Sequence, residues 1–585
     1  MGFEERIKKR LQFVYKTETK AEEAWQKLSQ RLQKYSREEF GAAKEDRGSQ
    51  DLTQADAMLI TYGDTIVQDG EPALETLSRF LKTYVKDAIP NVHLLPMYPY
   101  SSDDGFSVID YKAIDSKLGS WKEIGLLAEN YSLMFDAVVN HISQESNWFQ
   151  KYLECEEPYK HYFITSDPDL DYSKVTRPRA LPLLSEFETA EGQKHVWTTF
   201  SRDQIDLNYE CPEVLAEIVD LLVFYERSGA RFIRLDAIGF MWKEVGTTCI
   251  HHPCTHEIIK LMKDVLCEYA PGTKIITETN VPHEDNIRYF GDGTDEADLV
   301  YQFPLPPLTM YTLLTGDASI LSKWMSGLEL PGNDVTFFNF LSSHDGIGVR
   351  PTEGILNEEQ QNFLMESTLR HGGQVSYKDN GDGTKSPYEL NINYQDALAG
   401  PEDSDEIRIG RFLAAQTILL SMQGVPGIYI HSLLGSRNDY YGMNVSGIWR
   451  RINREKLDYE FVRKQLDGDT NRSRIFWELI RRLQLRGQEA AFAPQASQEV
   501  KNLDVRVLAL QRTCQKTGER ILALVNVSDE KVSLELPGVR GKNLLATLQN
   551  YDKEEMLYGA KEVTNAVIEG TIVLHPYEAA WIKVE

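Results

Sequence analysis

The sequence predicts an α/β protein built on a (β/α)8 TIM barrel, with inserted subdomains and a C-terminal antiparallel β-sandwich. Three observations lead to this fold class. Eight short apolar segments alternate with helical segments between residues 57 and 430, which is typical of a parallel sheet closed into a barrel. Two of the connections between these segments are far longer than one helix needs. After residue 495 the strands alternate apolar and polar residues, as antiparallel sheets do.

The segments that precede and build the barrel can be taken in chain order. Lys, Glu, Gln and Arg dominate the first residues with helical periodicity and no strand signal, so we expect a helical N-terminal extension over 1–55. The barrel strands are expected within 57–63, 91–98, 132–141, 230–240, 273–280, 297–303, 335–345 and 424–430.

The long connections locate two insertions. Residues 144–205, between the third strand and the third helix, are rich in aromatic residues and proline and are expected to form a small irregular domain. Residues 346–405 form a second insertion after the seventh strand, in which NGDGT (380–384) indicates a mobile loop. The barrel then covers 56–143 and 206–494, and the C-terminal β-sandwich covers 495–585.

The composition indicates a cytoplasmic protein that acts on small molecules. The net charge of -26 disfavours binding to nucleic acid or to acidic membrane surfaces. No apolar run approaches the roughly 20 residues that span a bilayer, and the N-terminus lacks the apolar core of a secretory signal. The 6 cysteines are scattered without a CxxC pair, which fits a reducing compartment. We expect no metal and no other cofactor, since CIHHPCTH (249–256) matches no common zinc spacing.

Two charged residues within an apolar strand raise the question of a catalytic site. In RFIRLDAIGF (231–240), Arg234 and Asp236 are two positions apart, so they point to the same face of the strand. Burying such charges costs several kcal/mol for each one unless they are paired. A structural ion pair at the end of a strand is one explanation. A catalytic carboxylate that a neighbouring arginine keeps ionised is the other.

Polar residues also end several other strands, where barrel enzymes carry their catalytic groups. A helix cap explains most single residues of this kind, but it does not explain carboxylates, histidines and an arginine at one barrel end. Two facing carboxylates suit glycoside chemistry, because one attacks the anomeric carbon while the other, protonated, releases the leaving group. The residues concerned are Asp103, Asp136, Asn140, His141, Arg234, Asp236, Glu278, His344 and Asp345.

Four of these segments resemble the conserved blocks of the α-amylase superfamily, glycoside hydrolase family 13, in the same order along the chain. They are DAVVNH (136–141), RLDAIGF (234–240), ITETN (276–280) and SSHDG (342–346). The resemblance implies that Asp236 is the nucleophile, Glu278 the general acid/base, and Asp345 the residue that binds the sugar 2- and 3-hydroxyls. It also implies that His141 and His344 contact the donor glucose.

Further segments resemble the sucrose phosphorylase subfamily, and this resemblance runs from about residue 55 to residue 585. They include LLPMYPYSSDDGFSVIDY (94–111), TTFSRDQIDLNYE (198–210) and HDGIGVRP (344–351). The resemblance implies that Asp103 and Arg450 hold the glucose 4-hydroxyl and that Phe106 and Phe200 flank the ring. We expect Gln204 and Arg234 at the same sugar site.

Within this subfamily, VTRPRALPLL (175–184), GFMWKE (239–244) and NGDGTKSPYELN (380–391) resemble most the glucosylglycerate phosphorylases. These enzymes split 2-O-α-glucosylglycerate with phosphate into α-glucose 1-phosphate and glycerate by double displacement. Sucrose phosphorylases are shorter and have DRGF where this chain has DDGF (103–106). Sucrose and sucrose 6′-phosphate phosphorylases stay as alternatives, as does an α-glucoside hydrolase. An inactive carbohydrate-binding protein is disfavoured, because Asp236, Glu278 and Asp345 are all present.

An anionic acceptor requires local cations in a chain with this net charge. Arginine suits both phosphate and carboxylate, because its planar guanidinium pairs with either through two hydrogen bonds. The resemblance implies that Arg179 contacts phosphate, and we expect Arg350 to face the carboxylate of glycerate. The oligomeric state stays open, with a homodimer as one alternative. The remaining acceptor candidates are Tyr388, Asn391, Gln395 and Arg437.

Overall fold

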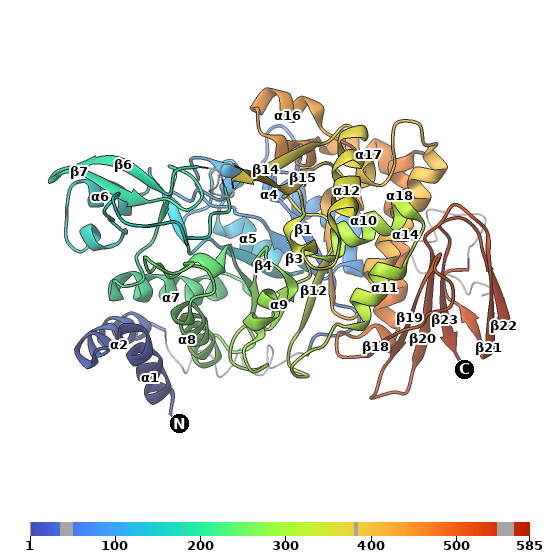
Figure 1. The fold of residues 1–585 in the computed structure, drawn as a ribbon, viewed down its shortest axis with the longest axis horizontal. Coiled ribbons are helices and arrows are strands. Elements are labelled where there is room, and N and C mark those ends of the chain that lie inside the picture. Colours follow the sequence, from blue (N-terminus) through green and yellow to red (C-terminus); the bar gives the residue numbers. More distant parts are fainter. Residues whose placement is uncertain (1, 36–50, 180, 380–383, 547–566) are drawn as a thin grey trace.

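The computed structural model describes residues 2–35, 51–179, 181–379, 384–546 and 567–585, and its centre is a closed parallel barrel (Figure 1). Strands that are neighbours in the barrel are neighbours in chain order, and the last strand closes on the first. The predicted eight-stranded barrel is therefore confirmed. Its strands are β1 (Met58–Thr61), β3 (Asn91–Leu94), β4 (Ser132–Ala137), β9 (Ala230–Leu235), β10 (Lys274–Thr277), β11 (Leu299–Tyr301), β12 (Thr336–Phe340) and β16 (Val425–Tyr429).

Helices surround the barrel and begin where the sequence supplies caps. A proline occupies the first turn of α7, α8 and α10, where its missing N–H is not needed. Ser120 and Glu123 form a capping box at the start of α5. The surrounding helices are α4 (Ala73–Phe80), α5 (Trp121–Ala128), α7 (Pro212–Arg227), α8 (Pro253–Tyr269), α9 (His283–Asn286), α10 (Leu305–Thr315), α11 (Ser319–Ser326), α14 (Asp405–Ser421) and α18 (Asn471–Gln488).

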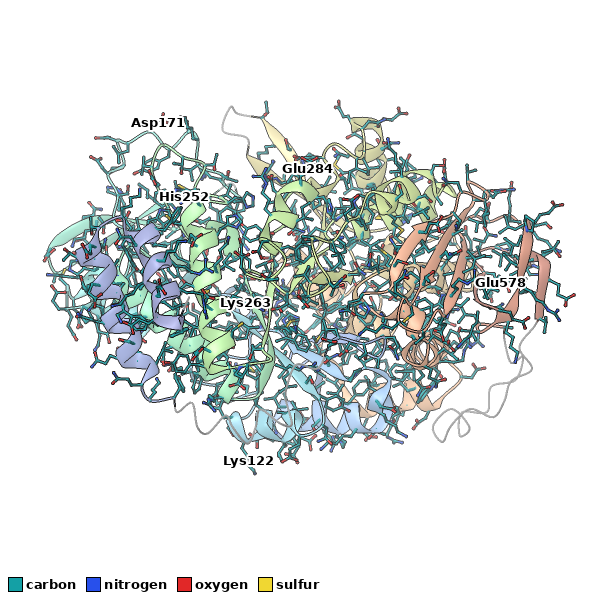
Figure 2. The ribbon with its side chains drawn as sticks, turned by 90° about the horizontal axis from the view of Figure 1, so that it is seen from below. Lys122, Asp171, His252, Lys263, Glu284 and Glu578 are labelled. Atoms are coloured by element: carbon teal, nitrogen blue, oxygen red, sulfur yellow. The ribbon has the colours of Figure 1, made fainter. Side chains whose placement is uncertain are left out.

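The N-terminal segment folds into two helices, α1 (Phe3–Tyr15) and α2 (Glu18–Leu32), that pack on the barrel helices α8 and α7. Figure 2 shows this pair beside α8, which His252 and Lys263 mark, at the end of the molecule opposite Glu578. Ion pairs complement the apolar contact: Arg10 Nε lies 2.6 Å from Asp264 Oδ2, and Lys27 Nζ lies 2.8 Å from Glu213 Oε2.

The first long connection, between β4 and α7, contains two small antiparallel pairs and a helix. β5 (His141–Ser143) pairs with β8 (Gln204–Asp206), and β6 (Leu184–Thr189) forms a hairpin with β7 (Gly192–Trp197). Helix α6 (Asn147–Leu153) lies between them in sequence. In Figure 1 β6, β7 and α6 extend to one side of the barrel strands, at the upper left.

The second long connection, between β12 and α14, forms a three-stranded antiparallel sheet. Its strands are β13 (Ile347–Gly348), β15 (Lys385–Asn391) and β14 (Gln374–Asp379), and its helices are α12 (Glu358–Arg370) and α13 (Tyr394–Ala397). Nearly all of the predicted mobile turn, 380–383, lies outside the described residues. After β16 the chain forms α15 (Ile430–Leu433), α16 (Tyr440–Ser446), β17 (Leu457–Asp458), which pairs with β2 (Ile66–Val67), and α17 (Tyr459–Asp467).

The sequence predicts an antiparallel β-sandwich for the C-terminal part. Its described strands are antiparallel, as expected, but they join in one hydrogen-bonded sheet rather than in two separate sheets. One side packs on α14, and Leu524, Leu534 and Ile582 belong to a second apolar core. We retain the predicted domain limits as a proposal. No helix in the described ranges combines the length and apolar character of a membrane crossing. The strands are β18 (Ser497–Val500), β19 (Val507–Thr513), β20 (Arg520–Asn526), β21 (Val532–Asn543), β22 (Val567–Leu574) and β23 (Ala579–Val584).

Candidate active site

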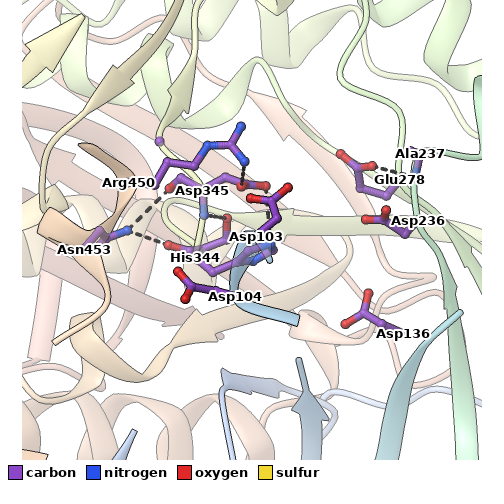
Figure 3. Close-up of polar contacts among 12 residues, drawn as sticks. Asp103, Asp104, Asp136, Asp236, Ala237, Glu278, His344, Asp345, Arg450 and Asn453 are labelled. Atoms are coloured by element: carbon purple, nitrogen blue, oxygen red, sulfur yellow. Dashed lines mark hydrogen bonds and ion pairs between the residues drawn. The ribbon is translucent and has the colours of Figure 1, made fainter. Parts of the chain in front are cut away.

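The parallel register of three neighbouring strands brings the predicted catalytic carboxylates to one end of the barrel. Arg234 on β9 lies opposite Asp136 on β4 and Ile276 on β10. Asp236 and Glu278 each follow their strand directly, so both side chains reach the carboxyl end of the barrel, where Figure 3 shows them facing the same space.

The buried arginine of the RLDA segment is paired on both sides. Arg234 Nη1 donates to Asp236 Oδ1 at 2.7 Å and also to Asp136 Oδ1. The ring Nε2 of His93 on β3 donates to Asp136 Oδ2 at 2.7 Å. Burial opposes ionisation of Asp136, but Arg234 and His93 lower its pKa to about 2. One guanidinium thus compensates two buried carboxylates, and this pairing offsets the free-energy cost of burying Arg234 and Asp236.

Glu278 has a different environment from Asp236. Its Oε2 accepts a hydrogen bond from the backbone N–H of Ala237 at 3.0 Å, whereas Arg234 Nη2 lies 4.0 Å away. Ala237 adopts a left-handed conformation, with φ of 48°, directly after Asp236. This sharp turn ends the strand and directs the N–H of Ala237 toward the neighbouring strand end.

Asp236 and Glu278 are buried close together, which disfavours a negative charge on both at once. Burial raises the pKa of both carboxyls, Arg234 opposes this rise, and nearby carboxylates add to it. Asp236 forms a direct ion pair with Arg234 at 2.7 Å, so its ionised form is compensated. Glu278 has a neutral backbone donor at short range and Arg234 only at 4.0 Å, so its ionised form is compensated less. This division suits a nucleophile beside a general acid.

Asp345 and Arg450 meet on the other side of the site (Figure 3). Arg450 Nη1 lies 2.8 Å from Asp345 Oδ1, and its Nε and Nη2 donate to the two oxygens of Glu389 at 2.9 and 3.0 Å. Burial opposes ionisation of Asp345, but Arg450 keeps the pKa of this carboxyl well below its usual range. Asp345 is therefore an ionised acceptor for hydroxyl donors.

Asp103 forms a third acidic point and is held by partners from the first insertion. Its Oδ2 accepts from Arg179 Nη2 at 2.9 Å and from Gln204 Nε2 at 3.2 Å. The resemblance implies that Asp103 works together with Arg450. In the structure both residues line one cavity, but Arg450 forms its ion pairs with Asp345 and Glu389.

Two aromatic rings and two histidines line the same space. The ring of Phe106 stacks on His344 with centroids 4.7 Å apart and planes 6° apart, and Phe200 lies 5.2 Å from His141. His141 Nε2 donates to the carbonyl oxygen of Phe106 at 2.9 Å. Burial lowers the pKa of His141 to about 4 and that of His344 to about 3, so both rings are neutral hydrogen-bonding groups at neutral pH.

The predicted residues therefore converge on one cavity of about 100 Å³. Arg234 lies beneath it, behind Asp236, and contributes through that ion pair. In the described ranges no three His, Cys, Asp or Glu side chains gather as metal ligands would. The predicted residues that line the cavity are Asp103, Phe106, His141, Arg179, Phe200, Gln204, Asp236, Glu278, His344, Asp345, Arg350, Tyr388 and Arg450.

Three predicted acceptor residues do not line this cavity, which corrects their placement. Asn391 is buried on β15, where its Nδ2 donates to Ser376 Oγ at 2.8 Å. Gln395 is buried on α13 with its amide nitrogen donating to the carbonyls of Gly435 and Ser436. Arg437 is half exposed, and its Nε donates to Asp396 Oδ1 at 2.6 Å. Each of these side chains already satisfies a structural partner.

Sequence reasoning did not single out Glu389 and Asn280, although both line the cavity. Glu389 is almost fully buried and holds Arg450. Its only sequence signal is its position beside Tyr388 in a strand. Asn280 ends the ITETN segment in a tight turn after β10, in which the N–H of Val281 donates to the carbonyl oxygen of Thr279 at 3.0 Å.

The comparisons with known proteins agree with this geometry. Residues 80–345 match the protein family described as "Alpha amylase, catalytic domain". Two proteins named glucosylglycerate phosphorylase are similar over most of the chain. The one from Allomeiothermus silvanus is 47% identical, covering 91% of each chain, and the one from Escherichia coli is 44% identical, covering 91% of this chain and 92% of that one.

A solved structure is similar in both fold and sequence. The crystal structure of sucrose 6F-phosphate phosphorylase from Thermoanaerobacter thermosaccharolyticum has a TM-score of 0.72 and 25% identity, covering 83% of this chain and 96% of that one. The barrel, the convergent strand-end carboxylates and these relatives agree with the family that the four sequence blocks indicate. The chain therefore belongs to the α-amylase family, in the branch that contains the glucosylglycerate phosphorylases.

Proposed function

We propose that this protein is a retaining glycoside phosphorylase, a hexosyltransferase that converts 2-O-α-glucosylglycerate and phosphate to α-glucose 1-phosphate and glycerate. The observation that carries the proposal is the 44–47% identity, over about nine tenths of the chain, to the two glucosylglycerate phosphorylases. Sucrose and sucrose 6F-phosphate phosphorylases are also relatives, but they are only 29% and 28% identical.

In the first step Asp236 attacks the anomeric carbon of the glucosyl unit. The bond from this carbon to the glycerate oxygen breaks, and Glu278 gives its proton to that oxygen. Glycerate therefore leaves with a neutral hydroxyl group, and a β-glucosyl ester of Asp236 forms. The ion pair of Asp236 with Arg234 supports the role of ionised nucleophile, and the raised pKa of the buried Glu278 supports the role of proton donor.

In the second step a phosphate oxygen attacks the anomeric carbon from the face that glycerate left. Glu278, now ionised, accepts the proton of the incoming phosphate, and the ester bond to Asp236 breaks. Two inversions give α-glucose 1-phosphate with retained configuration. We assign Asp345 and Asp103 as acceptors for sugar hydroxyls, with the stacked Phe106 and His344 against the ring.

The acceptor end of the cavity needs a cation that is free to bind an anion. Among the arginines that line it, Arg179 pairs with Asp103, and Arg450 with Asp345 and Glu389. In the described ranges Arg350 has no carboxylate partner, and its buried Nε has no hydrogen-bond partner. A guanidinium that lines the cavity without a carboxylate partner favours an anionic ligand, so we assign Arg350 to the carboxylate of glycerate.

We extend the proposal to the setting of the reaction. The substrates are small molecules, and the net charge of -26 supports neither nucleic acid nor an anionic membrane as a partner. A cytoplasmic location and a homodimer stay predictions. Light scattering of the purified chain checks the second.

The test is release of glucose 1-phosphate from glucosylglycerate, sucrose, sucrose 6′-phosphate and glucosylglycerol, each with and without phosphate. We expect phosphate-dependent release from glucosylglycerate alone. Release from another of these glucosides would keep the mechanism and replace the acceptor. Free glucose at one rate with or without phosphate would make the protein a hydrolase and would refute phosphorolysis.

A further inference from the structure

Asp103 and Asp104 are neighbours in the chain, but they line different cavities. Both adopt the left-handed conformation, with φ of 54° and 49°, and Gly105 follows with φ of 110°. Such backbone costs about 1–2 kcal/mol for each non-glycine residue, so surrounding contacts must hold it. The turn directs Asp103 into the catalytic cavity and Asp104 into a separate cavity of about 190 Å³ (Figure 3).

Asp104 binds two arginines from the segment that follows β16. Its Oδ2 accepts from Arg454 Nη1 at 2.6 Å and from Arg451 Nε at 3.1 Å, and its Oδ1 accepts from Arg451 Nη2. The side chain of Arg454 is almost completely buried, whereas that of Arg451 is over one third exposed. Arg454 is therefore the partner that burial makes dependent on Asp104.

The same guanidinium of Arg454 reaches the loop that carries Asp345. Its Nε donates to the carbonyl oxygen of His344 at 2.7 Å, and its Nη2 lies 3.6 Å from Asp345 Oδ1 with no hydrogen bond of its own. His344 in turn stacks on Phe106. Arg454 thus braces the backbone at His344 while staying just beyond hydrogen-bond distance from Asp345.

Without the charge of Asp104, Asp345 would be the remaining carboxylate near Arg454. Arg454 Nη2 and Asp345 Oδ1 already form a long ion pair at 3.6 Å, and a small shift of Nη2 would tighten it into a hydrogen-bonded pair on an oxygen that also faces Arg450. That shift would occupy the carboxylate oxygen and pull on the backbone of His344. Both changes would weaken the sugar end of the site and leave the acceptor end, with Arg350, unchanged.

We propose that Asp104 is a positioning residue for glucosyl transfer, which holds Arg454 away from Asp345 and so fixes His344 and Asp345 against the sugar. The proposal rests on the proposed function only for the choice of substrate. The resemblance and the comparisons assign Asp104 no role, although it departs from the DRGF segment of sucrose phosphorylases.

The test is a double-mutant cycle between Asp104→Asn and Arg454→Gln. In the wild-type background we expect Asp104→Asn to lower kcat/KM for the glucoside about tenfold and to leave KM for phosphate unchanged. In the Arg454→Gln background the same substitution should lower kcat/KM for the glucoside less than about twofold. Asp64→Asn is the matched control. Asp64 lines the same cavity and pairs with the partly exposed Lys456. Among the described residues, no hydrogen bond or ion pair joins either of these side chains to His344 or Asp345. This control should keep wild-type kinetics.

Equal losses in both backgrounds, or an equal rise in KM for phosphate, would overturn the proposal. If Asp104→Asn does not fold, Arg454→Lys keeps the charge but cannot brace His344 and hold Asp104 together. It should then show the same loss confined to the glucoside, and wild-type kinetics for Arg454→Lys would refute the proposal. The cycle uses whichever glucoside the unsubstituted enzyme splits. If it splits none, the proposed function fails, and glucose affinity by calorimetry, expected to drop about tenfold in Asp104→Asn, decides on Asp104.

Discussion

Replacing Arg350 by alanine should weaken the binding of glycerate more than the binding of phosphate. In the described ranges Arg350 is the cavity arginine without a carboxylate partner, so its removal leaves no buried carboxylate unpaired. The binding free energy lost in Arg350→Ala then equals the contribution of the contact between Arg350 and the ligand. A hydrogen bond to a charged group contributes about 1.5–3 kcal/mol, and about 1.4 kcal/mol corresponds to a factor of ten, so KM for glycerate should rise about 10- to 100-fold.

Phosphate should respond less, because Arg179 also lies at the cavity and offers it a second guanidinium. The assay measures KM for glycerate in synthesis from glucose 1-phosphate and KM for phosphate in the reverse reaction. Arg437→Ala is the matched control, because the sequence suggested the same role for it while the structure pairs it with Asp396, outside the cavity. Equal rises for glycerate and phosphate, or a rise in Arg437→Ala, would refute the assignment.

Three further predictions follow from the same contacts. Asp236→Asn should lower turnover by about 10⁴-fold or more with an unchanged circular dichroism spectrum, and retained turnover would exclude Asp236 as nucleophile. Glu278→Gln should raise Tm more at pH 8 than at pH 4: its raised pKa makes ionisation unfavourable in the fold, so stability is lost as pH rises, by about 1.4 kcal/mol per pKa unit. Equal Tm shifts would contradict this. Asp220→Asn on α7 should lower the free energy of unfolding in urea by about 1–3 kcal/mol, because Asp220 forms ion pairs with Lys34 and Lys112 and accepts a hydrogen bond from Tyr35. An unchanged free energy of unfolding would show that these contacts add no stability.

The barrel could be predicted from the sequence because its strands are short and apolar and alternate with helical segments, although two of the connections carry long insertions. All eight expected windows contain the observed strands. The carboxylates of the candidate site could also be predicted, because helix caps explain single polar residues at strand ends but not several carboxylates, histidines and an arginine together. In a closed parallel barrel, the residue after each strand meets its neighbours at one end, whatever the connections do.

The acceptor end could not be predicted in this way. Its residues come from the β13–β15 sheet and from connecting loops, whose folding depends on contacts far apart in sequence. Asn391 and Gln395 lie in the expected insertion, but each is turned inward by a local partner. Glu389 is the reverse case, because contacts far along the chain, with Arg450, 61 residues away, and with the N–H of Gly346, 43 residues away, distinguish it from an ordinary strand residue.

The charges at the site also explain how an anion enters a chain of net charge -26. Salt screens charges beyond about 10 Å, so the local balance decides. Around the sugar end, the carboxylates of Asp103, Asp104, Asp345 and Glu389 are paired with Arg179, Arg450, Arg451 and Arg454, which leaves little net field.

The nucleophile adds one negative charge to this balance in the free enzyme. In the proposed mechanism the formation of the glucosyl ester removes the charge of Asp236, but Glu278 has then given its proton to the leaving group and is ionised. The pair therefore carries one negative charge both before and after the first step, and only the position of that charge changes. It moves from Asp236 Oδ1, 2.7 Å from Arg234 Nη1, to Glu278, whose Oε2 lies 4.0 Å from Arg234 Nη2. The first step thus leaves Glu278 ready to accept the proton of the incoming phosphate, which is what the second step requires.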